Sequence, residues 1–169
     1  MSNDPQEVHV YDVGDSVTVR GTFGSSISEL SAQALVGATT IVVRDASGYA
    51  ASDVLAINPG TDTEERISVS SVSGNTITLA TALAYLHQPN ETVFELADPT
   101  EVKLQTKDGN GAVLTYLYSA AAVTRDSVGR FSKAITLDGK GGDWVYRFAG
   151  TGAVIAARTR RMIVREMEF

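Results

Sequence analysis

Several residue types on which functional sites often depend are scarce in this sequence. Its 169 residues include no cysteine, four prolines and two histidines. The lack of cysteine excludes disulfides, thiolate zinc sites and thiol nucleophiles. The two histidines, His9 and His87, cannot build a metal site with several imidazoles within one chain, and we expect each to be solvated or to cap a backbone group.

Long apolar runs are also missing. No uninterrupted apolar stretch approaches the roughly 18 residues that are needed to cross a bilayer. Residues 1–10 lack the basic flank and the apolar segment of a secretion signal. We therefore expect a protein that is made in the cytoplasm and has no membrane partner.

Basic residues are rare in the first part of the chain and common in the second. Residues 1–95 hold 12 acidic and 3 basic residues, whereas residues 96–169 hold 8 acidic and 11 basic residues, so −9 and +3 add up to the net charge of −6. Such asymmetry can direct one surface toward an acidic partner. The negative total argues against direct nucleic-acid binding.

The motifs of common enzymes are incomplete or lacking. No G-x-S-x-G segment presents a serine nucleophile. The glycines of residues 139–142 and 150–152 match only fragments of phosphate-binding and dinucleotide-binding loops. The spacing of a calcium-binding loop is lacking both in residues 108–111 and around the acidic Asp62, Glu64 and Glu65. The first segment is therefore interpreted as a hairpin turn and the second as a solvated acidic loop. We predict no catalytic residue, no cofactor and no metal, and we expect no enzymatic activity.

Alternation of apolar and polar residues with period two recurs along the chain and predicts antiparallel strands. Segments of this kind occupy residues 17–23, 102–107, 114–118, 135–137, 144–148 and 161–165. Trp144, Tyr146 and Phe148 form an aromatic row that predicts the central strand of a core. Short Gly- and Asp-rich turns between these segments are typical of a sandwich. Only residues 119–123 and 153–158 are rich enough in alanine to suggest a helical turn.

Residues 30–95 differ in composition from both flanks. They are rich in Thr, Ser and Ala and contain only Arg44 and Arg66 as basic residues. Strands are expected at residues 39–44, 53–57, 65–72, 76–79 and 92–96. We predict an inserted five-stranded module within a larger domain made of residues 1–29 and 96–169, because an exposed loop whose ends are close tolerates such an insertion.

Four segments of the larger domain carry a family resemblance in a fixed order. They are residues 11–23 (YDVGDSVTVRGTF), 98–104 (DPTEVKL), 129–131 (GRF) and 142–152 (GDWVYRFAGTG). Together they resemble immunoglobulin-like accessory proteins of tailed bacteriophage virions. The insert is similar to a small β-barrel module of phage tail and neck components in residues 39–43 (TTIVV), 48–49 (GY), 53–57 (DVLAI) and 73–79 (SGNTITL).

The resemblance implies an all-β chain: an immunoglobulin-like antiparallel sandwich interrupted by a small β-barrel. It implies a structural protein of the virion, at the neck or head-to-tail connection, present as a symmetric ring or in multiple copies. Its partners would be portal, adaptor or connector, tail or capsid subunits. A capsid decoration protein and a receptor- or glycan-binding tail module are the alternatives, and either the insert or the sandwich could make the main contact.

The C-terminal segment is the candidate partner interface. Arginines and apolar residues alternate there, and arginine combines a permanent charge with forked hydrogen bonding to carboxylates. The predicted interface residues are Arg158, Arg160, Arg161, Met162, Arg165, Met167 and Phe169. We expect this segment to dock on an acidic or polar surface of a neighbouring subunit, with the methionines and the phenylalanine as apolar anchors.

Overall fold

The protein is all-β. Its computed structural model describes residues 9–138, 141–152, 154 and 159–165, and within these ranges the chain forms strands β1 to β14 and no helix. Accordingly, no helix long and apolar enough to span a membrane occurs in the described ranges.

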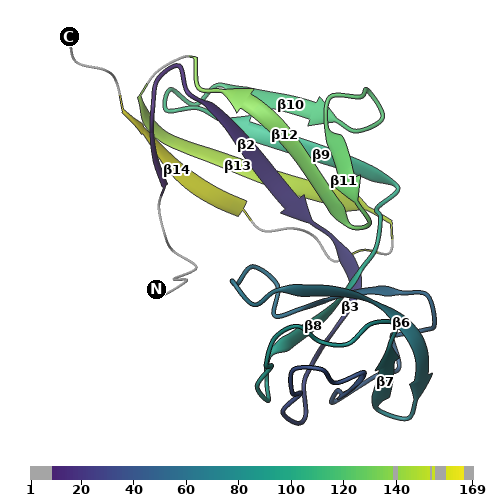
Figure 1. Ribbon diagram of the computed structural model, residues 1–169. Helices are drawn as coiled ribbons and strands as arrows, with labels where there is room; N and C mark the ends of the chain where they lie inside the picture. Colours follow the sequence, from purple (N-terminus) through teal and green to yellow (C-terminus); the bar gives the residue numbers. More distant parts are fainter. Residues whose placement is uncertain (1–8, 139–140, 153, 155–158, 166–169) are drawn as a thin grey trace. The chain divides into compact units, whose positions relative to one another are not determined.

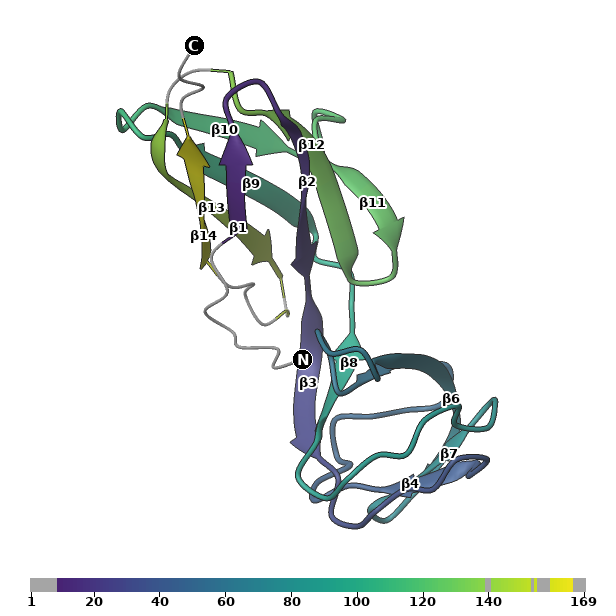
Figure 2. The same ribbon diagram turned by 60° about the vertical axis from the view of Figure 1, so that its left-hand side comes forward.

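The chain divides into two compact units, which are coloured by sequence in Figure 1 and Figure 2. The first unit consists of Met1–Phe23 and Pro99–Phe169, and the second of Gly24–Asp98. The division lies at different residues from those expected because the strand β3 (Gly24–Glu29) pairs with β8 (Thr92–Leu96) in the second unit. The second unit therefore has six strands, not the five that the sequence predicts.

Two sheets build the first unit. The five-stranded sheet has the order β1 (His9–Asp12), β14 (Thr159–Arg165), β13 (Gly142–Thr151), β9 (Glu101–Lys107) and β10 (Val113–Leu117). The three-stranded sheet has the order β11 (Thr124–Ser127), β12 (Arg130–Thr136) and β2 (Ser16–Thr22). All neighbours are antiparallel except β1 and β14, which are parallel.

Alternation places one shared core between these two sheets. On β9, Val102, Leu104 and Thr106 are buried, while Lys103 and Lys107 are exposed. The core also takes side chains from β13, β14, β2 and β12, so both sheets contribute to it. The aromatic row does lie on the central strand, because β13 runs between β14 and β9. A sandwich-like arrangement follows from two sheets that bury their facing sides together.

The second unit contains one six-stranded antiparallel sheet. Its order is β3, β8, β5 (Val54–Ile57), β6 (Glu65–Ser73), β7 (Thr76–Leu79) and β4 (Thr40–Val42). An isolated bridge between Leu30 and Val43 joins the ends of the two outer strands, β3 and β4. The five strands that the sequence predicts here are confirmed to within a few residues. The unit has its own buried core, which includes Leu55, Ile57 and Ile77.

The two alanine-rich segments are not helices where they are described. Residues 119–121 form a turn in which Ala121 N–H donates to the Tyr118 carbonyl at 2.8 Å, with Ala121 at a φ of 54°. Tertiary context overrides the alanine propensity, because five residues cannot sustain a helix alone. Residues 153 and 155–158 of the second segment lie outside the described residues.

Tyr49 makes the stability of the second unit sensitive to alkaline pH. Its side chain is 7% exposed, and its hydroxyl donates to the Val93 carbonyl at 2.8 Å. Burial, with a contribution from the charge of Glu95, raises the pKa of the Tyr49 hydroxyl above its ordinary value. The unfolded chain therefore loses this proton first, and we expect the free energy of unfolding to fall as pH rises above about 10.

The comparison that checks this uses Tyr49→Phe, which has no proton to lose. Urea midpoints of the second unit at pH 8 to 11, followed by circular dichroism, should decline less steeply in this variant than in the parent chain. Equal slopes in the two proteins would contradict the assignment.

Candidate functional site

The predicted interface segment forms an inner strand of the five-stranded sheet. Strand β14 lies between β1 and β13, so a partner meets its side chains and not a free backbone edge. Arg161 and Arg165 point to the outer face, with side chains 63% and 65% exposed. Met162 points to the opposite face and is 2% exposed in the core, so the expectation that it anchors a partner is wrong. The reason is the period of two, which sends neighbours on one strand to opposite faces.

The other predicted interface residues are not placed by the structure. Arg160 belongs to β14, but its side chain lies outside what the structure describes. Arg158, Met167 and Phe169 also lie outside the described residues. Their role in the interface stays a prediction.

The register of the sheet adds further basic residues to the same outer face. Lys107 of β9 lies opposite Val145 of β13, which lies opposite Arg161 of β14. Two residues along, Arg147 of β13 lies opposite Gln105 of β9. The resulting basic face contains Lys103, Lys107, Arg147, Arg161 and Arg165. The exposed positions of β9 are visible as an alternation in the sequence, but no sequence signal places them on the same sheet face as the arginines of β14.

Ion pairs neutralise only part of the basic face. Arg161 pairs with Asp143, and Arg165 pairs with Asp12 at 3.4 Å. Exposed pairs of this kind contribute little to stability. Within the part of the chain that the structure describes, no ion pair forms at Lys103, Lys107 or Arg147. This face therefore carries an excess of positive charge on a chain whose net charge is −6.

Exposed apolar side chains lie at both margins of the basic face. Val10 of β1 lies opposite Ile163 of β14, and they are 48% and 38% exposed. At the other margin, Val113 and Leu117 of β10 are 56% and 37% exposed. A mixture of arginine and apolar side chains is typical of protein interfaces.

Glu101 fixes the turn that follows β10. Its carboxylate accepts hydrogen bonds from the backbone N–H groups of Val102, Tyr118 and Ser119 at 2.8, 3.0 and 3.2 Å. Hydrogen bonding, first of all from the Ser119 side chain, lowers the pKa of the Glu101 carboxyl. Glu101 thus holds the end of β10 against β9.

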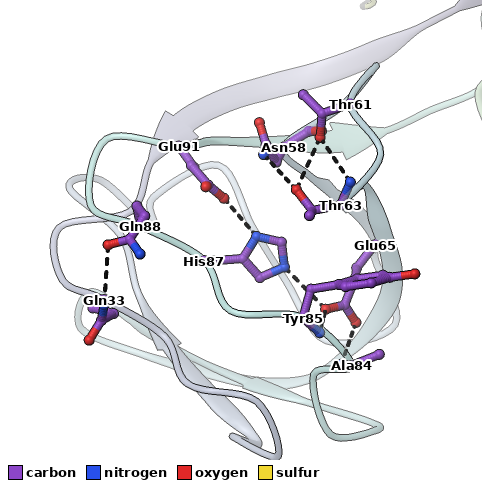
Figure 3. Close-up of polar contacts among 10 residues, drawn as sticks. All are labelled: Gln33, Asn58, Thr61, Thr63, Glu65, Ala84, Tyr85, His87, Gln88 and Glu91. Atoms are coloured by element: carbon purple, nitrogen blue, oxygen red, sulfur yellow. Dashed lines mark hydrogen bonds and ion pairs between the residues drawn. The ribbon is translucent and has the colours of Figure 1, made fainter. Parts of the chain in front are cut away.

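The second unit contains a buried ionisable cluster that sequence reasoning missed (Figure 3). The expectation that His87 is solvated or caps a backbone group is wrong, because it is 0% exposed and both of its ring nitrogens face carboxylates. Its Nδ1 lies 2.6 Å from Glu91 Oε2, and its Nε2 lies 3.1 Å from Glu65 Oε1. The imidazolium form donates to both carboxylates, whereas a neutral ring has a single N–H donor. The only local signal is the spacing of His87 and Glu91, four residues apart.

Glu65 does more than contact His87. It is 8% exposed, so it is not part of a solvated acidic loop as expected. Its carboxylate accepts the backbone N–H groups of Ala84 at 2.9 Å and Tyr85 at 2.7 Å. With two backbone N–H donors and the His87 ring around one carboxylate, the cluster holds the segment before His87 in place.

Two loops that this cluster supports expose a small apolar patch. Ala34 and His87 exchange backbone hydrogen bonds of 3.0 and 2.9 Å, and the side chains of Gln33 and Gln88 are joined at 3.1 Å (Figure 3). The loop patch consists of Leu35, Val36, Tyr85 and Leu86, which are 61%, 62%, 45% and 42% exposed. It is a second candidate for a protein contact.

No group of three or more His, Cys, Asp or Glu side chains that could hold a metal ion occurs among the residues described. The strongest candidate surface is thus the basic face of the first unit, together with its apolar margins. Comparisons with protein-family models, with curated proteins and with solved structures find no match to the chain.

Proposed function

We propose that the chain is a non-enzymatic structural protein of a tailed bacteriophage virion, located at the neck or head-to-tail connection. It acts by contacts with portal, adaptor, tail or capsid subunits and is present in several copies. The first unit is an immunoglobulin-like sandwich in this proposal, and the second is a small β-barrel. Two sheets around one core support the former, and the Leu30–Val43 bridge between the outer strands supports the latter.

The observation that carries the proposal is the basic face with apolar margins. Its positive charge is complementary to an acidic surface, and its exposed apolar residues supply area that becomes buried on contact. The resemblance of four ordered segments to virion accessory proteins is the reason for proposing a virion as the location.

A capsid decoration protein is the nearest alternative, since it would use the same kind of surface. A glycan-binding tail module is less well supported, because it needs a platform of several exposed aromatic rings. Among the described aromatic residues only Tyr85 and Tyr118 are exposed, and they belong to different units. Cryo-electron microscopy of whole particles distinguishes neck from capsid by location, and a glycan array tests the third function.

Charge reversal on the basic face tests the mechanism. We expect Lys103→Glu with Lys107→Glu to reduce incorporation into particles by at least about tenfold, because two attractive contacts become repulsive. The amount of chain per purified particle, measured by quantitative mass spectrometry, gives the result.

The matched control is Arg20→Glu with Arg125→Glu. These residues are exposed on β2 and β11 of the other sheet, and the change in net charge is the same. Normal incorporation of the Lys103 and Lys107 variant, or equal loss in both variants, would refute a role for the basic face.

A further inference from the structure

Strand β10 is an outer strand with an exposed backbone edge. Among the described strands it pairs only with β9 (Figure 2). The antiparallel register places Thr115 opposite Gln105. Four of its five residues are exposed, and Tyr116 is half-buried. Exposed outer strands are the positions at which sheets add a further strand.

The hydrogen bonds that flank β10 show which of its groups are free to pair. Asp108 N–H donates to the Ala112 carbonyl at 3.0 Å, and Tyr118 N–H donates to the Val102 carbonyl at 2.9 Å. Antiparallel ladders alternate, so even-numbered residues from 112 to 118 direct their N–H and C=O groups toward β9. The backbone groups of Val113, Thr115 and Leu117 therefore point away from β9, and of these the Leu117 carbonyl already accepts the N–H of Ala122 at 3.1 Å.

The other outer strands carry devices that discourage pairing, whereas β10 does not. Strand β1 is only four residues long and carries the charged Asp12. Strand β11 has a register shift between Arg125 and Ser127 and carries charged side chains. Strand β2 carries Arg20, and the Leu30–Val43 bridge joins the outer strands of the second unit. By contrast, residues 109–124 include no charged residue and no proline. Charges, prolines and bulges are the usual protection of an exposed edge.

We infer that β10 pairs with β10 of a second copy of this chain, antiparallel and centred on Thr115. This register places Val113 opposite Leu117 and Leu114 opposite Tyr116 of the second copy, so apolar side chains meet apolar side chains. The outward backbone groups of Val113 and Thr115 and the N–H of Leu117 then form about four hydrogen bonds across a two-fold axis.

The neutrality of the strand favours a second copy as the occupant. A charged edge repels its own copy, because a two-fold axis brings like charges together, but the run of residues 109–124 brings none. The axis stands perpendicular to the sheet, so the basic faces of the two copies lie on the same side of one continuous sheet. The pairing does not depend on the proposed function, since it concerns the purified chain alone.

Sedimentation velocity of the full chain over a range of concentrations tests this pairing. The parent chain should sediment with twice the mass of one copy at high concentration. Thr115→Lys should weaken dimerisation by at least about tenfold, because it places two lysines opposite each other on the axis. Gln105→Lys is the matched control, since it adds the same charge to the same face one strand further in, and its dimer should persist.

A cysteine at the axis gives an independent readout. The chain has no cysteine of its own, so Thr115→Cys introduces a single thiol. Hydrogen-bonded antiparallel pairs lie about 5.5 Å apart at Cα, within disulfide range, and mild oxidation should link two copies of this variant but not of Gln105→Cys. A parent chain that is monomeric at all concentrations, a dimer that survives Thr115→Lys, or equal linkage of the two cysteine variants would overturn the inference.

Discussion

Replacing Glu65 with alanine is expected to lower the free energy of unfolding of the second unit by about 3–5 kcal/mol. The change removes the acceptor of the Ala84 and Tyr85 N–H groups and leaves His87 Nε2 without its carboxylate. The His87 ring is then held in the protein interior without this hydrogen-bond partner, which costs more than the bond itself contributes. The Ala84 and Tyr85 N–H groups lose the acceptor that fixes their loop. The loop patch that contains Tyr85 should lose its fixed conformation at the same time.

The single tryptophan separates the effects on the two units. Trp144 belongs to the first unit, so its fluorescence should report an unchanged urea midpoint, while far-ultraviolet circular dichroism shows earlier unfolding of the second. Glu29→Ala is the control, because it removes a carboxylate of the same unit whose pair with Arg44 is solvent-exposed. Equal midpoints for the two variants would show that the buried cluster does not stabilise the fold.

Replacing Phe148 with alanine should destabilise the first unit by about 3–5 kcal/mol, because the surrounding core cannot fill the cavity. Phe148 is 1% exposed and packs directly on Gly21, where an added Cβ would lie only 2.5 Å from its ring. It therefore links β13 of one sheet to β2 of the other, and its loss affects both sheets.

Trp144 fluorescence in urea measures the Phe148 effect directly. Phe148→Leu is the matched variant, and it should cost less because more of the volume remains. Amide hydrogen exchange of Leu55 and Ile57 should stay unchanged, because these residues belong to the core of the second unit. An equal loss of protection there would mean that the two units unfold as one.

The strands that the sequence predicts well are those with one buried face. On β9 the alternation of Val102, Leu104 and Thr106 follows from burial on one side only. Strands β1, β3 and β11 were missed, because each is short or polar and lies at the margin of a sheet, where burial imposes no strong pattern. Alternation also groups Leu114 with Tyr116, yet Leu114 is 55% exposed because β10 has a neighbour on one side only.

The candidate site was predicted in part. The exposed arginines of β14 follow from their sequence pattern, but their neighbours on β9 and β13 depend on strand order and register, which alternation does not encode. The pairing of His87 with Glu65 joins residues 22 positions apart. Such contacts form only when distant segments of the chain come together in the folded state. Local sequence patterns therefore assign both His87 and Glu65 to the surface.

The two units are connected by two stretches of chain, at Phe23–Gly24 and at Asp98–Pro99. Gly24 and Leu96 are partners in the ladder between β3 and β8, so both connections reach the second unit at neighbouring points. A protease that cuts one connection leaves the units covalently attached through the other. Release of the second unit requires two independent cleavages, which gives the chain a tolerance to nicking that domains joined end to end do not have.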